Sequence, residues 1–190
     1  MSNYYNENAK IFFEGTVQSD MSSNYTDFLS KLPEGSHILD AGCGSGRDSK
    51  NFIDLGYEVT AIDASEAMCT LASEYIHQPV KQMKFQEIDF KEDFDGIWAC
   101  ASLLHVPSHE LPEVLQRLRR ALKPQGILYA SFKYGEFEGE RNGRYFHDLN
   151  EEKAEAFFVE EGFKISKMWL TGDVRVGREN EKWLNILCTI

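Results

Sequence analysis

A strand, a glycine-rich turn and a helix follow one another within residues 37–55. The apolar run His37–Asp40 has strand length, and residues 47–55 have the period of a helix. Three glycines stand at alternate positions of the turn between them: Gly42, Gly44 and Gly46. Glycines let a ligand lie against the backbone, and a helix N-terminus leaves free N–H groups at the mouth of the turn. This unit predicts an α/β fold that binds a nucleotide-like ligand at the carboxyl edge of its sheet.

Along the rest of the chain, apolar runs of strand length alternate with segments of helical period, which is typical of a mostly parallel sheet. We expect further strands at residues 57–63, 80–88, 94–101, 126–132, 163–170 and 183–190, and further helices at residues 65–76, 108–122 and 150–162. The last two strands are expected to form an antiparallel pair. The link between the third and fourth strands is too short for a helical crossover, so we expect a loop there. The length favours one domain over residues 1–190.

The residues around the glycine turn narrow the choice of ligand. The dinucleotide fingerprint GxGxxG would need a third glycine at position 47, where this chain has Arg47. Asp40 precedes the turn, and a carboxylate there is unfavourable for a pyrophosphate but attracts an ammonium or sulfonium group by ~1–4 kcal/mol. S-adenosylmethionine carries both cations, so the pattern favours this cofactor. The alternatives are a lone helix-capping role for Asp40 and an NAD-dependent oxidoreductase as the enzyme class.

Two more acids follow later strands of the predicted sheet. Asp63 ends the second strand, where an acid accepts hydrogen bonds from both ribose hydroxyls. NAD enzymes use the same device, so Asp63 supports an adenosine without naming the cofactor. Asp89, just after the third strand, is placed to accept the exocyclic amine of adenine, and Phe90 is placed to pack on the ring. The alternatives are a helix dipole partner for Asp63 and an ordinary loop acid for Asp89.

Four segments resemble motifs of the seven-stranded, Rossmann-like S-adenosylmethionine-dependent methyltransferases. Residues 38–48, ILDAGCGSGRD, are similar to the first motif, and residues 61–68, AIDASEAM, to the second. Residues 94–105 resemble the fourth strand with its following loop, and residues 118–129 the helix and turn before the fifth strand. The resemblance covers roughly residues 4–190 and is closest to small bacterial members, including tellurite-resistance-like methyltransferases.

The resemblance implies both a fold and a set of cofactor contacts. The fold is a Rossmann-like sheet with strand order 3-2-1-4-5-7-6, the last strand antiparallel and helices on both faces, formed by a core at residues 36–190 behind an N-terminal helical cap or lid at residues 1–32. The implied site has Asp40, Gly42 and Gly44 around the methionyl part, Asp63 on ribose, Asp89 near adenine, and Cys100 or Ala101 beside the donor. The full expected cofactor-binding set is Tyr5, Asp40, Gly42, Gly44, Gly46, Arg47, Asp63, Ala64, Met68, Asp89, Phe90, Cys100 and Ala101. The chain lacks an Asn-Pro-Pro-Tyr motif after the fourth strand, which argues against methylation of exocyclic base nitrogens.

His105 and Tyr5 are the remaining candidates near the chemistry. His105 lies just beyond the carboxyl end of the fourth strand, where it is our candidate general base for a protonated oxygen or nitrogen acceptor. A histidine that only shapes the loop ahead of Pro107 is the alternative. In the resembling family, the segment that holds Tyr5 commonly closes over the cofactor as a lid, so Tyr5 is expected to touch the cofactor. Simple packing of this segment onto the domain is the alternative.

Composition excludes several partners. The formal charge of −11 repels phosphate backbones, so nucleic acid is not an expected partner. No apolar run approaches the ~18 residues needed to span a bilayer, and the first ten residues lack a secretory layout, which together predict a cytoplasmic protein without a membrane partner. The four cysteines have neither metal-site nor disulfide spacing and are expected to be buried free thiols, so no metal is expected: Cys43, Cys69, Cys100 and Cys188.

The acceptor pocket is expected to use residues 133–147 and 171–182. Side chains there that present donors to an anionic small molecule are Tyr134, Arg141, Arg144, Tyr145, Arg175 and Arg178, with free surface arginines as the alternative. The absence of an appended recognition domain favours a small acceptor. The sequence therefore predicts an enzyme that moves a methyl group from S-adenosylmethionine to an oxygen, nitrogen or sulfur of a small molecule. A non-catalytic S-adenosylmethionine-binding module is the alternative, and the sequence makes no prediction of oligomeric state.

Overall fold

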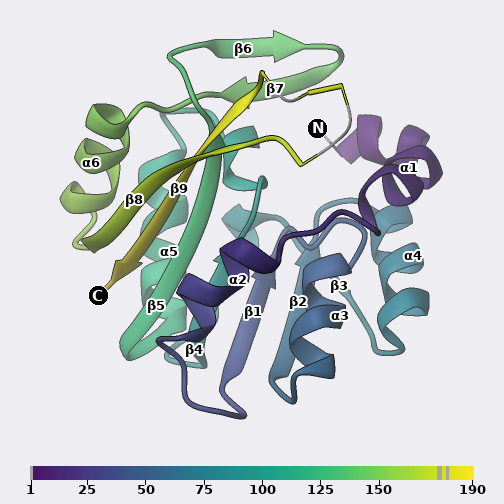
Figure 1. Ribbon diagram of the computed structural model, residues 1–190, viewed down its shortest axis with the longest axis horizontal. Helices are drawn as coiled ribbons and strands as arrows, with labels where there is room; N and C mark the ends of the chain where they lie inside the picture. The colour runs from purple at the N-terminus through teal and green to yellow at the C-terminus, as the bar shows by residue number, and fades with distance from the viewer. Residues whose placement is uncertain (1, 175–176, 179) are drawn as a thin grey trace.

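The computed structural model describes residues 2–174, 177–178 and 180–190 of the chain. The strands of its main sheet lie in the order β3-β2-β1-β4-β5-β9-β8, and β9 runs antiparallel to both of its neighbours (Figure 1). Strands β6 and β7 form a separate hairpin, so the sheet strands numbered along the chain have the order 3-2-1-4-5-7-6. The predicted fold class and strand order are confirmed.

The bounds of the elements follow. The sheet strands are β1 (His37–Ala41), β2 (Glu58–Asp63), β3 (Lys81–Gln82), β4 (Phe94–Ala99), β5 (Leu122–Lys133), β8 (Lys164–Gly172) and β9 (Lys182–Thr189), and the hairpin strands are β6 (Glu138–Arg141) and β7 (Arg144–His147). The helices are α1 (Ser2–Thr16), α2 (Ser22–Leu29), α3 (Arg47–Asp54), α4 (Glu66–Ile76), α5 (Leu111–Ala121) and α6 (Glu151–Glu160), with short 3₁₀ turns η1 (Phe85–Glu87) and η2 (Leu103–His105).

Alternate residues of the central strands are buried in two different layers. Ile38 and Trp98 pack in a cluster with α2 and α3, whereas Leu39 and Ile97 pack in a cluster with α5 and α6. Successive side chains of a strand point to opposite faces, so both faces of the sheet are buried under helices, as a parallel sheet requires. Figure 1 shows α2 and α3 in front of the sheet and α5 behind it.

The third strand is much shorter than the sequence predicts. A strand is expected over residues 80–88, but the structure has only Lys81–Gln82, followed by the turn Phe85–Glu87. This strand is at the edge of the sheet and pairs only with β2. The Glu87 carboxylate accepts a hydrogen bond from the Lys84 N–H (2.8 Å), which closes the turn and ends the extended backbone. The predicted loop before the fourth strand is confirmed.

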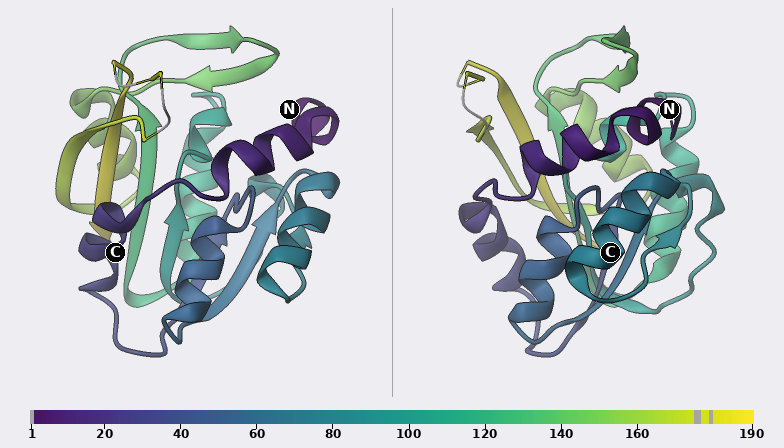
Figure 2. Two further views of the ribbon diagram at one scale, coloured as in Figure 1. Left: turned by 45° about the vertical axis from the view of Figure 1, so that its right-hand side comes forward. Right: turned by 90° about the vertical axis from the view of Figure 1, so that its right-hand side faces the viewer.

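Two more boundaries differ from the sequence analysis. The helix predicted from residue 108 begins at Leu111. Residues 108–110 form a turn instead, in which the N–H groups of Glu110 and Leu111 both donate to the Pro107 carbonyl (2.9 and 3.0 Å) and the Ser108 N–H donates to the Glu138 carboxylate (2.8 Å). Residues 138–147 form the hairpin β6–β7, which was not among the predicted strands. This hairpin lies beyond the carboxyl ends of the parallel strands (Figures 1 and 2).

The structure also bears on membranes, metals and thiols. None of the described helices is long and apolar enough to cross a membrane. Within the described ranges, no three histidine, cysteine, aspartate or glutamate side chains are grouped so as to hold a metal ion. All four cysteines are free thiols, and only Cys100 is partly exposed.

Candidate active site

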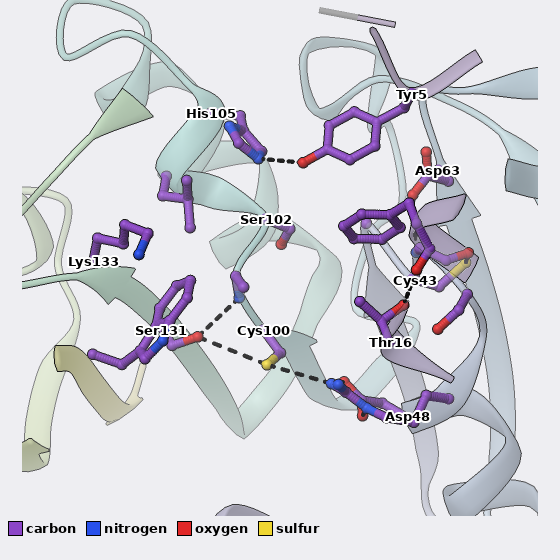
Figure 3. Close-up of a pocket in the computed structure, with 18 of the residues that line it drawn as sticks. Tyr5, Thr16, Cys43, Asp48, Asp63, Cys100, Ser102, His105, Ser131 and Lys133 are labelled. Atoms are coloured by element: carbon purple, nitrogen blue, oxygen red, sulfur yellow. Dashed lines mark hydrogen bonds and ion pairs between the residues drawn. The ribbon is translucent and has the colours of Figure 1, made fainter. Parts of the chain in front are cut away.

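A cavity of about 720 Å³ opens at the carboxyl ends of the parallel strands. Its volume lies in the range of ~300–1,000 Å³ that is typical of small-molecule sites. The predicted site residues that line it are Tyr5, Gly42, Gly44, Arg47, Asp63, Ala64, Met68, Cys100, Ala101 and His105. Figure 3 shows Asp63 and Cys43 on one side and Ser131 and Lys133 on the other. We call these the β1–β2 half, which follows β1 and β2, and the β5–β7 half, which is formed by β5, β7, the start of β9 and the described residues between β8 and β9.

The glycine turn packs directly under the loop that follows β4. Gly42 has φ +83°, and a Cβ atom there would lie 2.5 Å from the Cβ of Ser102. The Ser102 hydroxyl donates to the Ala41 carbonyl (2.7 Å) and holds the two loops together. Any side chain at position 42 would therefore force these loops apart, and the turn exposes bare backbone to the cavity instead.

Asp63 is fixed at the wall of the β1–β2 half. Its carboxylate accepts hydrogen bonds from the N–H groups of Gly44 (3.0 Å) and Ser65 (2.9 Å). Burial raises the pKa of this carboxyl, and the two backbone donors oppose the shift. Ser65 caps α4 as predicted, because its hydroxyl oxygen accepts from the Met68 N–H (3.2 Å). The acid is thus held where the sequence predicts a ribose contact.

Asp40 does not line the cavity. Its side chain is buried behind the turn, where it accepts a hydrogen bond from the Ser49 hydroxyl (2.6 Å). Burial, reinforced by the nearby Asp48 carboxylate, raises the pKa of Asp40 to about 8. The acid that the sequence analysis placed against the ligand therefore supports the turn from behind, and its negative charge is reduced at neutral pH.

Asp48 lines the cavity instead, although the sequence analysis did not single it out. Its carboxylate accepts hydrogen bonds from the Tyr25 hydroxyl (2.5 Å) and the Trp98 indole (2.8 Å) and forms a two-pronged ion pair with Arg47 (2.7 and 2.9 Å). Burial would raise the pKa of Asp48, but the charge of Arg47 and these hydrogen bonds hold it below its usual value. Asp48 is thus an ionised anchor under the turn, and its position one residue after Arg47 was the only sequence signal for it.

Three other predicted residues also lie outside the cavity lining. Asp89 is exposed, and Phe90 packs edge-to-face on Phe94 with a centroid distance of 5.1 Å. Gly46 lets α3 approach α4, since a Cβ there would lie 2.9 Å from the Ile76 side chain. The shortened third strand brings other residues to the cavity that the sequence analysis missed: Met83, Lys84, Phe85 and Gln86.

Helix α1 covers the opening between the two halves. Tyr5, Phe12 and Thr16 line the cavity from this helix, which crosses above the carboxyl ends of the strands (Figure 2). The Asn6 side-chain oxygen accepts hydrogen bonds from the Ser65 hydroxyl (2.6 Å) and the Ala67 N–H (3.2 Å) at the start of α4. These contacts fix α1 over the site, and the role of this segment as a lid stays a prediction.

His105 faces the cavity and meets Tyr5 there (Figure 3). Its Nδ1 lies 2.6 Å from the Tyr145 carbonyl, and its Nε2 lies 2.8 Å from the Tyr5 hydroxyl. Because a carbonyl oxygen only accepts, Nδ1 carries the proton and Nε2 accepts from Tyr5. Burial lowers the pKa of His105 to about 4, so the imidazole is neutral at pH 7. It is a proton acceptor of low basicity.

The six predicted acceptor-binding side chains separate in the structure. Arg144 and Arg178 line the cavity, whereas Tyr134, Arg141 and Tyr145 do not, and Arg175 lies outside the described residues. Arg141 forms an ion pair with Asp148 (2.5 Å), and the Tyr145 hydroxyl donates to Glu138 (2.6 Å). The β5–β7 half also includes Lys133, Phe146 and Asp173, which lie in the segments predicted for the acceptor pocket. It further includes three residues outside those segments: Ser131, Trp183 and Asn185.

Comparison with known proteins finds a family model that matches part of this chain. Residues 38–126, which include the glycine turn, Asp63 and the loop after β4, match the model of a methyltransferase domain. This match covers a little under half of the chain. The chain is 36% identical over 116 residues to a putative methyltransferase, YqeM, of Bacillus subtilis, an alignment that covers 55% of this chain and 47% of that protein. It is also 26% identical over 160 residues to an uncharacterized methyltransferase of Staphylococcus carnosus, covering 80% of this chain and 77% of that protein.

A solved methyltransferase structure has the same fold. This structure is the 1,6-didemethyltoxoflavin-N1-methyltransferase of Burkholderia thailandensis, with bound 1,6-didemethyltoxoflavin and S-adenosylhomocysteine. The two chains superpose with a TM-score of 0.78 at 20% sequence identity. The superposition covers 98% of this chain and 84% of that one. The chain spans about half the length of several curated relatives that it matches, including YqeM. The comparisons thus show the fold and a similarity to methyltransferases over part of the chain. The narrower likeness to tellurite-resistance-like members stays a prediction.

Proposed function

We propose that this chain is a methyltransferase, which transfers a methyl group from S-adenosylmethionine to a small-molecule acceptor. The observation that carries the proposal is the cradle at Gly42, where bare backbone faces the cavity because a Cβ atom would meet Ser102 at 2.5 Å. With Asp63 on the same wall, this half offers N–H groups, a carboxylate and a surface without side chains, which fit an amino-acid nucleoside. S-adenosylmethionine bound there would supply an activated methyl group on a sulfonium.

The described residues of the β1–β2 half divide the binding work. We assign Gly42 and Gly44 to the methionyl part and Asp63 to the ribose hydroxyls. Other cofactor contacts are assigned to Tyr5, Arg47, Ala64, Met68, Cys100 and Ala101, all of which line the cavity. Met83 and Phe85 are apolar residues of the lining and take the place of Asp89 and Phe90 beside the adenine.

The carboxylates of this half favour a cationic cofactor over a dinucleotide. Asp48 and Asp63 both line the cavity, and the only arginine that lines it next to the turn, Arg47, already forms an ion pair with Asp48. The Arg47–Asp48 pair carries no net charge, so a pyrophosphate would meet the Asp63 carboxylate and no uncommitted cation among the described residues of the turn. This is the role that the sequence analysis gave to Asp40, and it is an argument against the NAD-dependent alternative.

The acceptor is proposed to be small and anionic. The β5–β7 half gathers Lys133, Arg144 and Arg178 around the cavity in a protein whose formal net charge is −11. Methyl transfer needs alignment more than it needs acid or base groups, and well-oriented intramolecular reactions gain ~7–11 kcal/mol from it at best. A cavity closed by α1 is suited to hold two small molecules in such an alignment. The cytoplasmic location expected from composition stays part of this proposal.

Two measurements on the purified protein test the proposal. Calorimetric titration is expected to show stoichiometric uptake of S-adenosylmethionine and no uptake of NADH. Incubation with methyl-labelled donor and a small-molecule extract is expected to place label in a low-mass product. NADH uptake without S-adenosylmethionine uptake would overturn the proposal, whereas donor uptake without any labelled product would support the non-catalytic binding module.

His105 is proposed to accept a proton from the acceptor or its methylated product at Nε2, after the acceptor has displaced the Tyr5 hydroxyl that occupies this lone pair. We expect His105→Ala to lower kcat by about 10²-fold, the lower end of the range for general bases, because a pKa of about 4 makes the imidazole a weak base. The affinity of the same variant for S-adenosylmethionine shows whether the loss of kcat arises indirectly, through a disturbed cofactor site. Tyr5→Phe keeps the imidazole and removes its partner, and is expected to weaken donor binding while kcat at saturating donor persists. Equal losses of kcat in both variants would mean that His105 acts only by holding Tyr5.

A further inference from the structure

Arg144 lines the β5–β7 half, and aromatic rings surround its guanidinium. The centre of its guanidinium lies 4.8 Å from the ring centroid of Tyr4, 5.1 Å from that of Phe146 and 6.0 Å from that of Tyr5. These rings come from α1 and β7, so the guanidinium sits where the lid meets the hairpin. Stacking on aromatic faces fixes an arginine's plane without using its N–H donors.

The N–H donors of Arg144 are largely uncommitted. Its Nε is buried and has no hydrogen-bond partner among the described residues, and its Nη1 makes only a long contact of 3.5 Å to the Tyr5 hydroxyl. No carboxylate lies within 4.0 Å of its guanidinium in the described part of the chain. A buried donor without a partner is unfavourable, and it is more so when the group is charged.

The neighbouring arginines contrast with Arg144. Arg141, three residues earlier on the same hairpin, forms an ion pair with Asp148, and Arg178 lies 3.8 Å from Glu181. In both pairs, an acidic side chain of the protein itself binds the arginine. Arg144 lines the main cavity and also the adjoining hollow of the hairpin, so its charge faces space that a ligand can enter.

We propose that Arg144 binds a carboxylate of the methyl acceptor and thereby selects anionic acceptors; this rests on the proposed methyltransferase function. The guanidinium fork matches a planar carboxylate with two parallel N–H···O bonds, and a site walled by aromatic rings strengthens such bonds by excluding water. Arg144 shares its cavity with Cys100 and Ala101, beside which the donor is assigned. An acceptor held by its carboxylate at Arg144 extends its other end toward the donor.

The same contact rejects neutral acceptors. A site built to bind a charged group discriminates strongly against an analogue that lacks it, because the buried donors are then left unpaired. Removal of a charge-assisted hydrogen bond is expected to weaken acceptor binding by about 10- to 100-fold. Arg144 is thus assigned as the specificity-determining residue of the acceptor site.

The first test observes Arg144 directly by NMR. In protein labelled with ¹⁵N-arginine, the Nε–H resonance of Arg144 is assigned by its loss in Arg144→Lys and followed during titration with acetate, benzoate, inorganic phosphate and benzyl alcohol, with and without S-adenosylhomocysteine. We expect saturable shifts with the carboxylates and none with benzyl alcohol. Saturation by phosphate but not by carboxylates would assign the site to phosphorylated acceptors and overturn the proposal that Arg144 binds a carboxylate. Absence of a shift with any anion, or an equal shift with the neutral alcohol, would overturn the proposal.

The second test separates this inference from the proposed function. Arg144→Gln is compared with Arg120→Gln, which removes the same charge from an exposed position of α5 outside the cavity. Benzoate affinity is expected to fall about 10- to 100-fold in Arg144→Gln alone, while both variants still unfold cooperatively and take up S-adenosylmethionine stoichiometrically. Equal benzoate affinity in the two variants would refute the role of Arg144. Failure of the protein to take up S-adenosylmethionine would instead refute the proposed function, and the NMR titration without cofactor would still decide the inference.

Discussion

Gly42→Ala is expected to lower the affinity for S-adenosylmethionine by more than tenfold and the free energy of unfolding by about 2–5 kcal/mol. The left-handed conformation at φ +83° costs an alanine ~1–2 kcal/mol. Its Cβ would also lie 2.5 Å from the Cβ of Ser102, an atom next to the backbone, so the loops after β1 and β4 must separate. Forced overpacking of this kind adds ~1–3 kcal/mol. Calorimetric titration and urea unfolding measure the two effects.

Gly35→Ala is the matched control. Gly35 has φ +73°, but a Cβ there would have no atom within 4 Å. The variant is expected to lose only the ~1–2 kcal/mol of backbone strain and to keep wild-type affinity for the cofactor. If Gly42→Ala and Gly35→Ala behave alike in both assays, close packing of the turn on Ser102 has no part in cofactor binding.

Asp48→Asn is expected to lower the free energy of unfolding by about 3–5 kcal/mol, because it leaves the charge of Arg47 without its partner inside the protein. The amide also has only one oxygen to accept the hydrogen bonds that Tyr25, Trp98 and Arg47 give to the carboxylate. Urea unfolding at pH 7 measures the loss. Because Arg47 and Asp48 line the β1–β2 half, the affinity for S-adenosylmethionine is expected to fall as well.

A control on the same helix and a change of pH test this explanation. Asp54 forms an exposed ion pair with Lys50, also on α3, so Asp54→Asn is expected to cost less than about 1 kcal/mol. The pKa of Asp48 is lower in the folded than in the unfolded chain, so its stabilisation is complete above pH ~4 and is lost as the pH falls through the folded value. The stability difference between wild type and Asp48→Asn should therefore shrink on acidification below pH ~4. A difference that stays constant to pH 2 would contradict the ion pair as its cause.

The glycine turn and the strand order are features that the local sequence pattern predicts correctly. Residues 37–55 form β1, the turn and α3 close to the predicted bounds, and Ser65 caps α4 as expected. Each of these depends on neighbours in sequence: backbone freedom at glycine, a hydroxyl before a helix, and apolar residues at a fixed period. The edge strand near residue 81 is the exception, because it pairs with β2 alone and ends where the Glu87 carboxylate closes the following turn.

Local sequence patterns do not predict which of the acids near the glycine turn faces the cavity. Asp40 and Asp48 lie eight residues apart on either side of the turn, and both are carboxylates in the first motif. Asp40 accepts a hydrogen bond from Ser49 behind the turn. Asp48 accepts hydrogen bonds from Tyr25 and Trp98, which are distant along the chain and hold it at the cavity. The hydrogen bond between Tyr5 and His105 joins residues 100 positions apart. Pairing across such separations appears only when the helices and loops have packed.

The sequence by itself determined the α/β architecture, the place of the glycine turn and the Asp63 carboxylate at the end of β2, since each follows from residues a few positions apart. Only the tertiary structure decided that Asp48 and not Asp40 faces the cavity, that α1 reaches His105, and that Arg144 meets the cavity without an acid of its own among the described residues. The physical reason is that burial and charge pairing depend on which segments become neighbours in space, and no local period along the chain encodes that.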